Sequence, residues 1–228
     1  MPIRLYIASV KPLEDAARFD RLLAAVPPER REKVLAFRVA GARRLSLGAG
    51  LLLSRALADA GLSAGECRVA EYGKPYFPAL PDFHFSLSHS GDMALCAVSA
   101  APVGCDIEEI GKYNAPLARR FFHPREQRWL SSLPEDERAA AFYRLWTCKE
   151  SFIKAIGLGL SQPLDSFAVL PGDTVTLTQT ADPRPWQVKS FREGEYFCAL
   201  CGLEAMDAVP PVRVDFGDEK FEKYACTL

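Results

Sequence analysis

Two acidic residues near the middle of the chain have the spacing of a metal site. Asp106 and Glu108 lie in the segment GCDIEE, residues 104–109. Because side chains two apart on a strand share a face, both carboxylates would point one way while Cys105 and Ile107 face the core. Converging carboxylates repel each other unless a cation lies between them, and a hard cation prefers oxygen ligands. The alternative is an exposed strand face that carries two solvated acids.

A third acid and a lysine follow on an expected helix. Trp146, Glu150 and Lys154 are four residues apart and therefore form one line along that helix. The line borders an apolar stripe of Leu145, Phe152, Ile153 and Ile156. Glu150 would complete a metal site with Asp106 and Glu108, and Lys154 would then be free to bind a phosphate. The alternative is a surface ion pair between Glu150 and Lys154, which stabilises a helix by only a few tenths of a kcal/mol.

Two further segments offer groups that bind phosphate. Ser88 and His89 lie where a strand ends in the hydroxyl-rich turn SLSHSG, and exposed backbone N–H groups of such turns also bind anions. Lys74 stands between Gly73 and Pro75, which restrict its backbone. Taken singly, His89 also fits an ordinary loop histidine, and Lys74 an ordinary turn lysine.

The elements that must position these residues repeat in order along the chain. Helical periodicity or strand alternation predicts strands over 5–10, 83–87, 93–98 and 103–110, a basic amphipathic stretch over 30–38, and a helix over 42–60 that ends at Gly61. Short helices over 115–122 and 124–130, a long helix over 134–156 that ends at Gly157, and strands over 174–178, 186–192 and 196–200 follow. Each half runs from helix to β-hairpins, so we expect two α+β lobes, residues 1–102 and 103–228.

Composition narrows the class of protein. The chain has 228 residues, 49% of them hydrophobic, and a formal net charge of -1 with a pI near 6.3. Such a balance favours a globular protein without the basic field that nucleic-acid binding needs. We expect neither a signal peptide nor a membrane span. Seven cysteines without regular spacing favour reduced thiols in the cytoplasm, and Cys198 and Cys201 are expected to pack in a strand.

Taken together, the segments resemble a known family. EYGKPYF, FHFSLSHSGDMALCAVS, VGCDIEEI, RRFF and FYRLWTCKESFIKAIGLGLSQPLDSF are similar to the phosphopantetheinyl transferases of the surfactin-synthetase-activating type. The resemblance spans nearly the whole chain. It implies a pseudo-dimeric monomer of two similar lobes, each a helix packed on a small antiparallel sheet, with coenzyme A in the cleft between the lobes.

The same resemblance implies roles for individual residues. The acids that match the family's magnesium ligands are Asp106, Glu108 and Glu150, and manganese is the alternative metal. Glu150 also matches the proposed general base, and Lys154 would stabilise developing charge. The residues implied to surround the phosphates of the cofactor are Arg30, Lys33, Arg44, Lys74, Ser88, His89 and Lys154.

The implied reaction transfers the phosphopantetheine arm of coenzyme A to a serine of an acyl or peptidyl carrier protein. This reaction needs cations for the phosphates and a base for the serine proton, and it needs no cysteine nucleophile. A metal-dependent phosphoester hydrolase and a non-catalytic module that binds coenzyme A or a carrier protein are the alternatives. The basic and aromatic stretch from Arg119 to Trp129 is a candidate docking surface for the carrier, since carrier domains of this class present an acidic helix.

Overall fold

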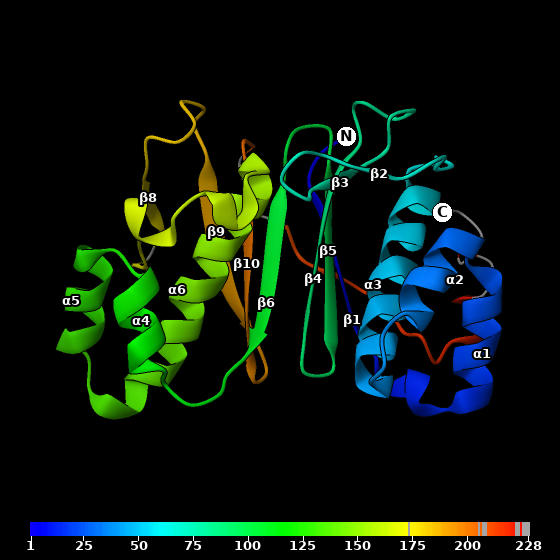
Figure 1. The fold of residues 1–228 in the computed structure, drawn as a ribbon, viewed down its shortest axis with the longest axis horizontal. Coiled ribbons are helices and arrows are strands. Elements are labelled where there is room, and N and C mark those ends of the chain that lie inside the picture. Colours follow the sequence, from blue (N-terminus) through cyan, green and yellow to red (C-terminus); the bar gives the residue numbers. More distant parts are fainter. Residues whose placement is uncertain (173, 205, 207–208, 222–223, 225–228) are drawn as a thin grey trace.

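The computed structural model describes residues 1–172, 174–204, 206, 209–221 and 224. It is built from four layers in the order helix, sheet, sheet, helix (Figure 1). Each half contributes one long helix and one small sheet, so the predicted α+β architecture of two similar lobes is confirmed.

The first lobe packs helix α3 (Ala40–Asp59) on a sheet with strand order β11-β1-β5-β4. The strands of this sheet are β1 (Arg4–Ser9), β4 (His84–Ser90), β5 (Met93–Ser99) and β11 (Val212–Arg213). Beyond α3 lie α1 (Ala16–Ala25) and α2 (Pro28–Leu35), and a small hairpin joins β2 (Arg68–Val69) to β3 (Pro75–Tyr76). Helix α3 closes its last turn before Gly61, whose φ of +67° is the left-handed cap that the sequence predicts.

The second lobe packs helix α6 (Glu135–Ile156) on a sheet with strand order β6-β10-β9. Its strands are β6 (Gly104–Glu109), β9 (Gln187–Glu193) and β10 (Tyr196–Gly202), and both pairings are antiparallel. Helices α4 (Ala115–Phe121) and α5 (Pro124–Ser132) cover the outer side of α6, near the hairpin of β7 (Ala168–Leu170) and β8 (Thr176–Thr178). Short 3-10 helices lie at Lys11–Glu14, Gly159–Ser161, Leu164–Ser166 and Glu219–Phe221.

Alternation along the strands divides the hydrophobic core into three parts. On β1, Tyr6 faces α3, whereas Leu5 and Ile7 face the second sheet. On β10, Ala199 and Cys201 face α6, whereas Cys198 and Leu200 face the first sheet. The two sheets therefore share a middle core, and successive residues of these strands are buried on opposite faces.

Five of the described cysteines are core residues. Cys96, Cys105, Cys148, Cys198 and Cys201 are free and buried, and Cys67 is free and exposed. Cys198 and Cys201 lie on opposite faces of β10, so their role is strand packing, as predicted. Cys226 lies outside the described residues. Among the helices that the structure describes, none combines the length and the apolar composition needed to cross a membrane.

The last part of the chain returns to the first lobe, which the sequence pattern did not predict. β11 pairs in parallel with β1, and Val214, Phe216 and Phe221 join the core beneath α3. The predicted lobe boundary, between residues 102 and 103, stays a prediction. The first lobe also contains this late segment. Helix α1, the β2–β3 hairpin and β7 were also not predicted, and β8 is shorter than the expected strand over 174–178.

Gly104 allows β6 to lie directly against α6, and its replacement tests this close packing. A Cβ atom at Gly104 would lie 2.0 Å from the carbonyl oxygen of Ser151 and 2.5 Å from the amide nitrogen of Ala155. Both neighbours are backbone atoms, so we expect Gly104→Ala to lower the free energy of unfolding by about 3 kcal/mol in urea denaturation. Gly65→Ala is the control, because its Cβ would meet only Ala79 at 4.0 Å, and its change should stay within about 0.5 kcal/mol. Equal losses in the two variants would contradict the packing argument.

Candidate active site

The two lobes meet along β4 and β6, the neighbouring edge strands of the two sheets. Hydroxyl groups of β4 accept hydrogen bonds from backbone N–H groups of β6. Cys105 N donates to Ser86 at 3.0 Å, Ile107 N to Ser88 at 3.4 Å and Glu109 N to Ser90 at 3.1 Å. We call these three contacts the serine seam. Because side chains two apart on a strand share a face, the alternating serines of FSLSHS meet β6 at every second residue.

Ser88 lies at the centre of a hydrogen-bonded trio. Its hydroxyl donates to Asp106 Oδ1 at 2.7 Å, and Lys154 Nζ donates to the same hydroxyl at 3.1 Å. Lys154 Nζ also lies 2.6 Å from Asp106 Oδ1, which forms an ion pair between the end of α6 and the middle of β6. Residues that are far apart in the sequence, on β4, β6 and α6, thus converge at one point.

Glu108 and Glu150 lie beside this trio and carry raised pKa values. Burial, followed by repulsion from Asp106, raises the pKa of Glu150 to about 7. Burial also raises the pKa of Glu108, although Ser90 donates a hydrogen bond to its Oε2 at 2.7 Å. Burial acts to lower the pKa of Lys154, but Asp106, Cys105 and Glu150 together outweigh burial and raise that pKa. The three carboxylates therefore share one electrostatic environment with more negative than positive charge.

The acids have the chemistry of a site for a hard cation. Asp106 is buried, and its Oδ2 has no hydrogen-bond partner. An orphaned carboxylate oxygen beside two further acids suits a divalent cation, which prefers oxygen ligands and would offset their repulsion. In the described part of the chain, no three His, Cys, Asp or Glu side chains are already placed to hold a metal. Asp106 Oδ1 is bound by Lys154 instead.

Cations of both lobes lie near His89. Burial lowers the pKa of His89, and the charges of Lys154 and Arg30 lower it further. Burial lowers the pKa of Arg30 to about 10, and its Nε is buried without a partner while its Nη2 donates to the carbonyl of Ser46. Lys33 is exposed. Burial raises the pKa of the Cys67 thiol, and the charges of Lys33 and Arg30 oppose this rise. His89 and Arg30 can therefore bind an anion next to the trio.

Two predicted phosphate ligands have other partners in this structure. Arg44 Nη2 lies 3.4 Å from Glu14 Oε1, and Arg44 Nε is buried without a partner. Lys74 Nζ donates to backbone carbonyls at the end of α6, and burial lowers its pKa to about 8. The phosphate roles of Arg44 and Lys74 stay predictions that these contacts do not support.

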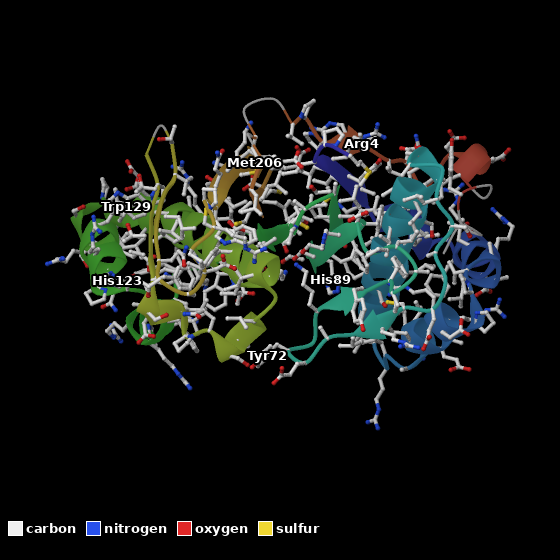
Figure 2. The ribbon with its side chains drawn as sticks, turned by 90° about the horizontal axis from the view of Figure 1, so that it is seen from above. Arg4, Tyr72, His89, His123, Trp129 and Met206 are labelled. Atoms are coloured by element: carbon white, nitrogen blue, oxygen red, sulfur yellow. The ribbon has the colours of Figure 1, made fainter. Side chains whose placement is uncertain are left out.

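A cavity of about 300 Å³ runs beside the trio between the β2–β3 turn, β4 and the end of α6. Its lining includes polar groups of Glu150 and Lys154, and it includes apolar groups of Tyr72, Leu87 and Leu160. Figure 2 shows Tyr72 and His89 on one side of the molecule where the lobes meet, with Arg4 and Met206 on the opposite side. The cavity therefore offers an elongated ligand a path that ends at the charged groups.

Aromatic residues of the second lobe pack around Trp146. Its ring stacks on Phe142 with centroids 5.9 Å apart and meets Phe121 edge to face at 6.0 Å. Trp146 lies on the same helix as Glu150, and its role in the structure is aromatic packing. Phe122 is buried in the core. The exposed arginines of this region are Arg119, Arg120, Arg125 and Arg128.

Some residues of the site were missed by the sequence analysis. Ser86 and Ser90 bind the backbone of β6, and the alternation of serines in FSLSHS is a signal that could have identified them. Lys149 and Glu126 form a fully buried ion pair of 2.6 Å, in which the lysine also donates to the carbonyl of Phe167. Glu126 also accepts a hydrogen bond from Val169 N, so the pair joins α5, α6 and β7. Its partners are too far apart in the sequence to show any spacing.

Comparisons with known proteins identify the family of the chain. Residues 102–201 match the family model of the 4'-phosphopantetheinyl transferase superfamily. The chain is 42% identical over 195 residues to a 4'-phosphopantetheinyl transferase of Bacillus subtilis, covering 82% of this chain and 86% of that protein. It is also 42% identical over 188 residues to 4'-phosphopantetheinyl transferase Sfp of Bacillus subtilis, covering 80% and 84% of the two chains.

A holo-(acyl-carrier-protein) synthase of Bacillus anthracis in complex with CoA (3',5'-ADP) aligns with a TM-score of 0.41 and 18% identity, covering 46% of this chain and 97% of that chain. The identity and coverage of the two Bacillus subtilis relatives decide the family. The chain belongs to the 4'-phosphopantetheinyl transferase superfamily and is a transferase.

Proposed function

We propose that the chain transfers the 4'-phosphopantetheine group of coenzyme A to a serine hydroxyl of an apo acyl or peptidyl carrier protein. The observation that carries this proposal is the trio of Ser88, Asp106 and Lys154, which is bonded across the lobe junction beside Glu108 and Glu150. The trio brings a phosphate-binding cation and several acids to one end of the cavity. We infer that coenzyme A lies in that cavity and across the cations near His89.

The residues of the site match the charges of the reaction. A new bond forms between the carrier serine oxygen and the β-phosphorus, while the bond from that phosphorus to the bridging oxygen breaks. The electron pair leaves with adenosine 3',5'-bisphosphate, and Glu150 accepts the serine proton directly or through water. Lys154 neutralises charge on the transferring phosphate, and the candidate ligands of the other phosphates are Arg30, Lys33, Arg44, Ser88 and His89.

Asp106, Glu108 and Glu150 would hold a magnesium ion, and manganese would be accepted by the same oxygen ligands. When bound, the ion supplies positive charge to the pyrophosphate and to the departing bisphosphate. The two lobes belong to one chain, so we propose that it acts as a monomer. The free thiols suit the reducing conditions of the cytoplasm.

A single assay distinguishes this proposal from its alternatives. The protein is mixed with coenzyme A, magnesium and a purified apo carrier protein, and the carrier is weighed by mass spectrometry. A gain equal to the phosphopantetheine group on the carrier supports transfer. Release of phosphopantetheine into solution would indicate a hydrolase, and an unmodified carrier with bound coenzyme A would indicate a binding module.

Replacing single acids tests the assignment of the site. We expect Asp106→Asn and Glu150→Gln each to lower kcat for carrier modification by about 100-fold or more, because each removes negative charge from groups that act on the phosphate or the proton. Glu109→Gln is the control, since Glu109 is exposed on the same strand and follows Glu108 on the opposite face. Turnover of either site variant near that of Glu109→Gln, at saturating magnesium, would refute the assignment.

The metal assignment also has a readout that does not depend on turnover. We expect magnesium chloride at about 100 times its dissociation constant to raise the Tm of the protein without coenzyme A by about 5 °C. The rise should vanish in Asp106→Asn, because this variant loses the buried oxygen ligand. Potassium chloride at equal ionic strength controls for screening. An equal rise in the wild type and in Asp106→Asn would place the metal elsewhere.

The proposed carrier surface consists of the exposed arginines of α4 and α5. Arg119 and Arg120 lie on α4, and Arg125 and Arg128 lie on α5. His123 and Trp129 mark the outer end of the second lobe, away from His89 (Figure 2). A carrier bound there would have to reach along α4 toward the lobe junction. We expect its acidic helix to face these arginines.

Charge reversal tests this docking surface. Rim charges act mainly on encounter rate and salt sensitivity, so Arg125→Glu with Arg128→Glu should raise the KM for the carrier about 10-fold and flatten its salt dependence. The KM for coenzyme A should not change. Arg4→Glu is the control, because Arg4 lies on the opposite side of the molecule from His89 (Figure 2). If the double variant keeps the wild-type KM for the carrier, the carrier docks elsewhere.

A further inference from the structure

Lys74 links the first lobe to the backbone of the second. It lies in the turn between β2 and β3, and its ammonium group donates three hydrogen bonds to backbone carbonyls. The acceptors are Val103 O at 3.0 Å, Lys154 O at 2.7 Å and Ala155 O at 3.0 Å. A lysine ammonium has three N–H groups, so all of its donors are in use.

The acceptors explain why a lysine stands at this position. Lys154 and Ala155 belong to the last turn of α6, and the final carbonyls of a helix have no partners within the helix. A cation at that end is also favoured by the helix dipole. Gly157 follows in the left-handed conformation with a φ of +80°, and a Cβ there would lie 3.3 Å from Lys74 Cδ. The lysine stem therefore fits closely beneath the end of the helix.

The same three bonds locate the groups of the site. Val103 directly precedes β6, which carries Asp106, and Lys154 reaches Asp106 with its own side chain. Lys74 thus binds the backbone of α6, which carries Lys154, and the backbone just before β6, which carries Asp106. A shift between the end of α6 and the start of β6 would change the position at which Lys154 meets a phosphate.

We infer that Lys74 is a positioning residue for the transfer reaction, which holds the end of α6 against the start of β6 and does not itself bind a phosphate. This inference rests on the proposed function. It replaces the phosphate role that the family resemblance implies for Lys74. To bind a phosphate, Lys74 would have to break its hydrogen bonds to the carbonyls at the end of α6. Lys33 is exposed and can contact a phosphate without such a loss.

The test compares Lys74→Met with Lys33→Met in the full chain. For Lys74→Met we expect kcat to fall about 10- to 100-fold through misplacement of Lys154, with the KM for coenzyme A within about 2-fold of wild type. Binding of adenosine 3',5'-bisphosphate, measured by calorimetry, should also stay within about 2-fold. For Lys33→Met we expect weaker bisphosphate binding and a higher KM, because its contact is with the cofactor.

Hydrogen exchange supplies a second readout without substrate. In Lys74→Met, amides in the last turn of α6 should exchange at least about 10-fold faster than in wild type, and those of Lys33→Met should not change. If Lys74→Met does not fold, Lys74→Gln keeps two N–H donors and should give an intermediate loss of kcat.

The outcomes separate the two proposals. If Lys74→Met weakens bisphosphate binding as Lys33→Met does while kcat holds, Lys74 is a phosphate ligand and the inference is overturned. A lower Tm with unchanged kcat and KM would show a role in stability alone and would also overturn it. If the wild-type protein modifies no carrier, the proposed function fails, and hydrogen exchange still decides whether Lys74 holds the helix end.

Discussion

The serine seam is the contact on which the site depends. β4 and β6 belong to different sheets, so the N–H groups on the facing edge of β6 need acceptors that a backbone ladder does not supply. Ser86, Ser88 and Ser90 provide them through their hydroxyls. Buried N–H groups are costly when unpaired, so the seam sets the register between the lobes as well as joining them. Because each serine meets β6 at every second residue, Ser88 lies next to Asp106.

Charge balance follows from that register. Asp106 is buried, and a buried carboxylate is stable only with a partner. Lys154 supplies one partner for one oxygen, whereas the other oxygen and the two neighbouring glutamates remain short of positive charge. A junction of this kind is suited to ligands that bring cations and phosphates together. The fold thus leaves these carboxylates short of positive charge, which a metal bound with the cofactor would supply.

Much of the fold was open to prediction because it depends on local periodicity. The long helices, the strands of both sheets except β11, and the left-handed glycines after α3 and α6 lie close to where the pattern placed them. The alternation that puts Cys105 and Ile107 in the core also puts Asp106 and Glu108 on the other face. The return of β11 to β1 was not open to prediction, since a two-residue strand has no period of its own.

The sequence by itself identified the candidate residues of the site, because a strand period of two and a helix period of 3.6 assign acids and lysines to faces. It also determined the family, through motifs that span most of the chain. Only the tertiary structure decided which partner each group has. Two lysines of the same helix lie on different sides of it, so Lys149 pairs with Glu126 in the core and Lys154 with Asp106 at the junction. Lys74 illustrates the same point, because its three acceptors lie far along the chain, where spacing holds no information.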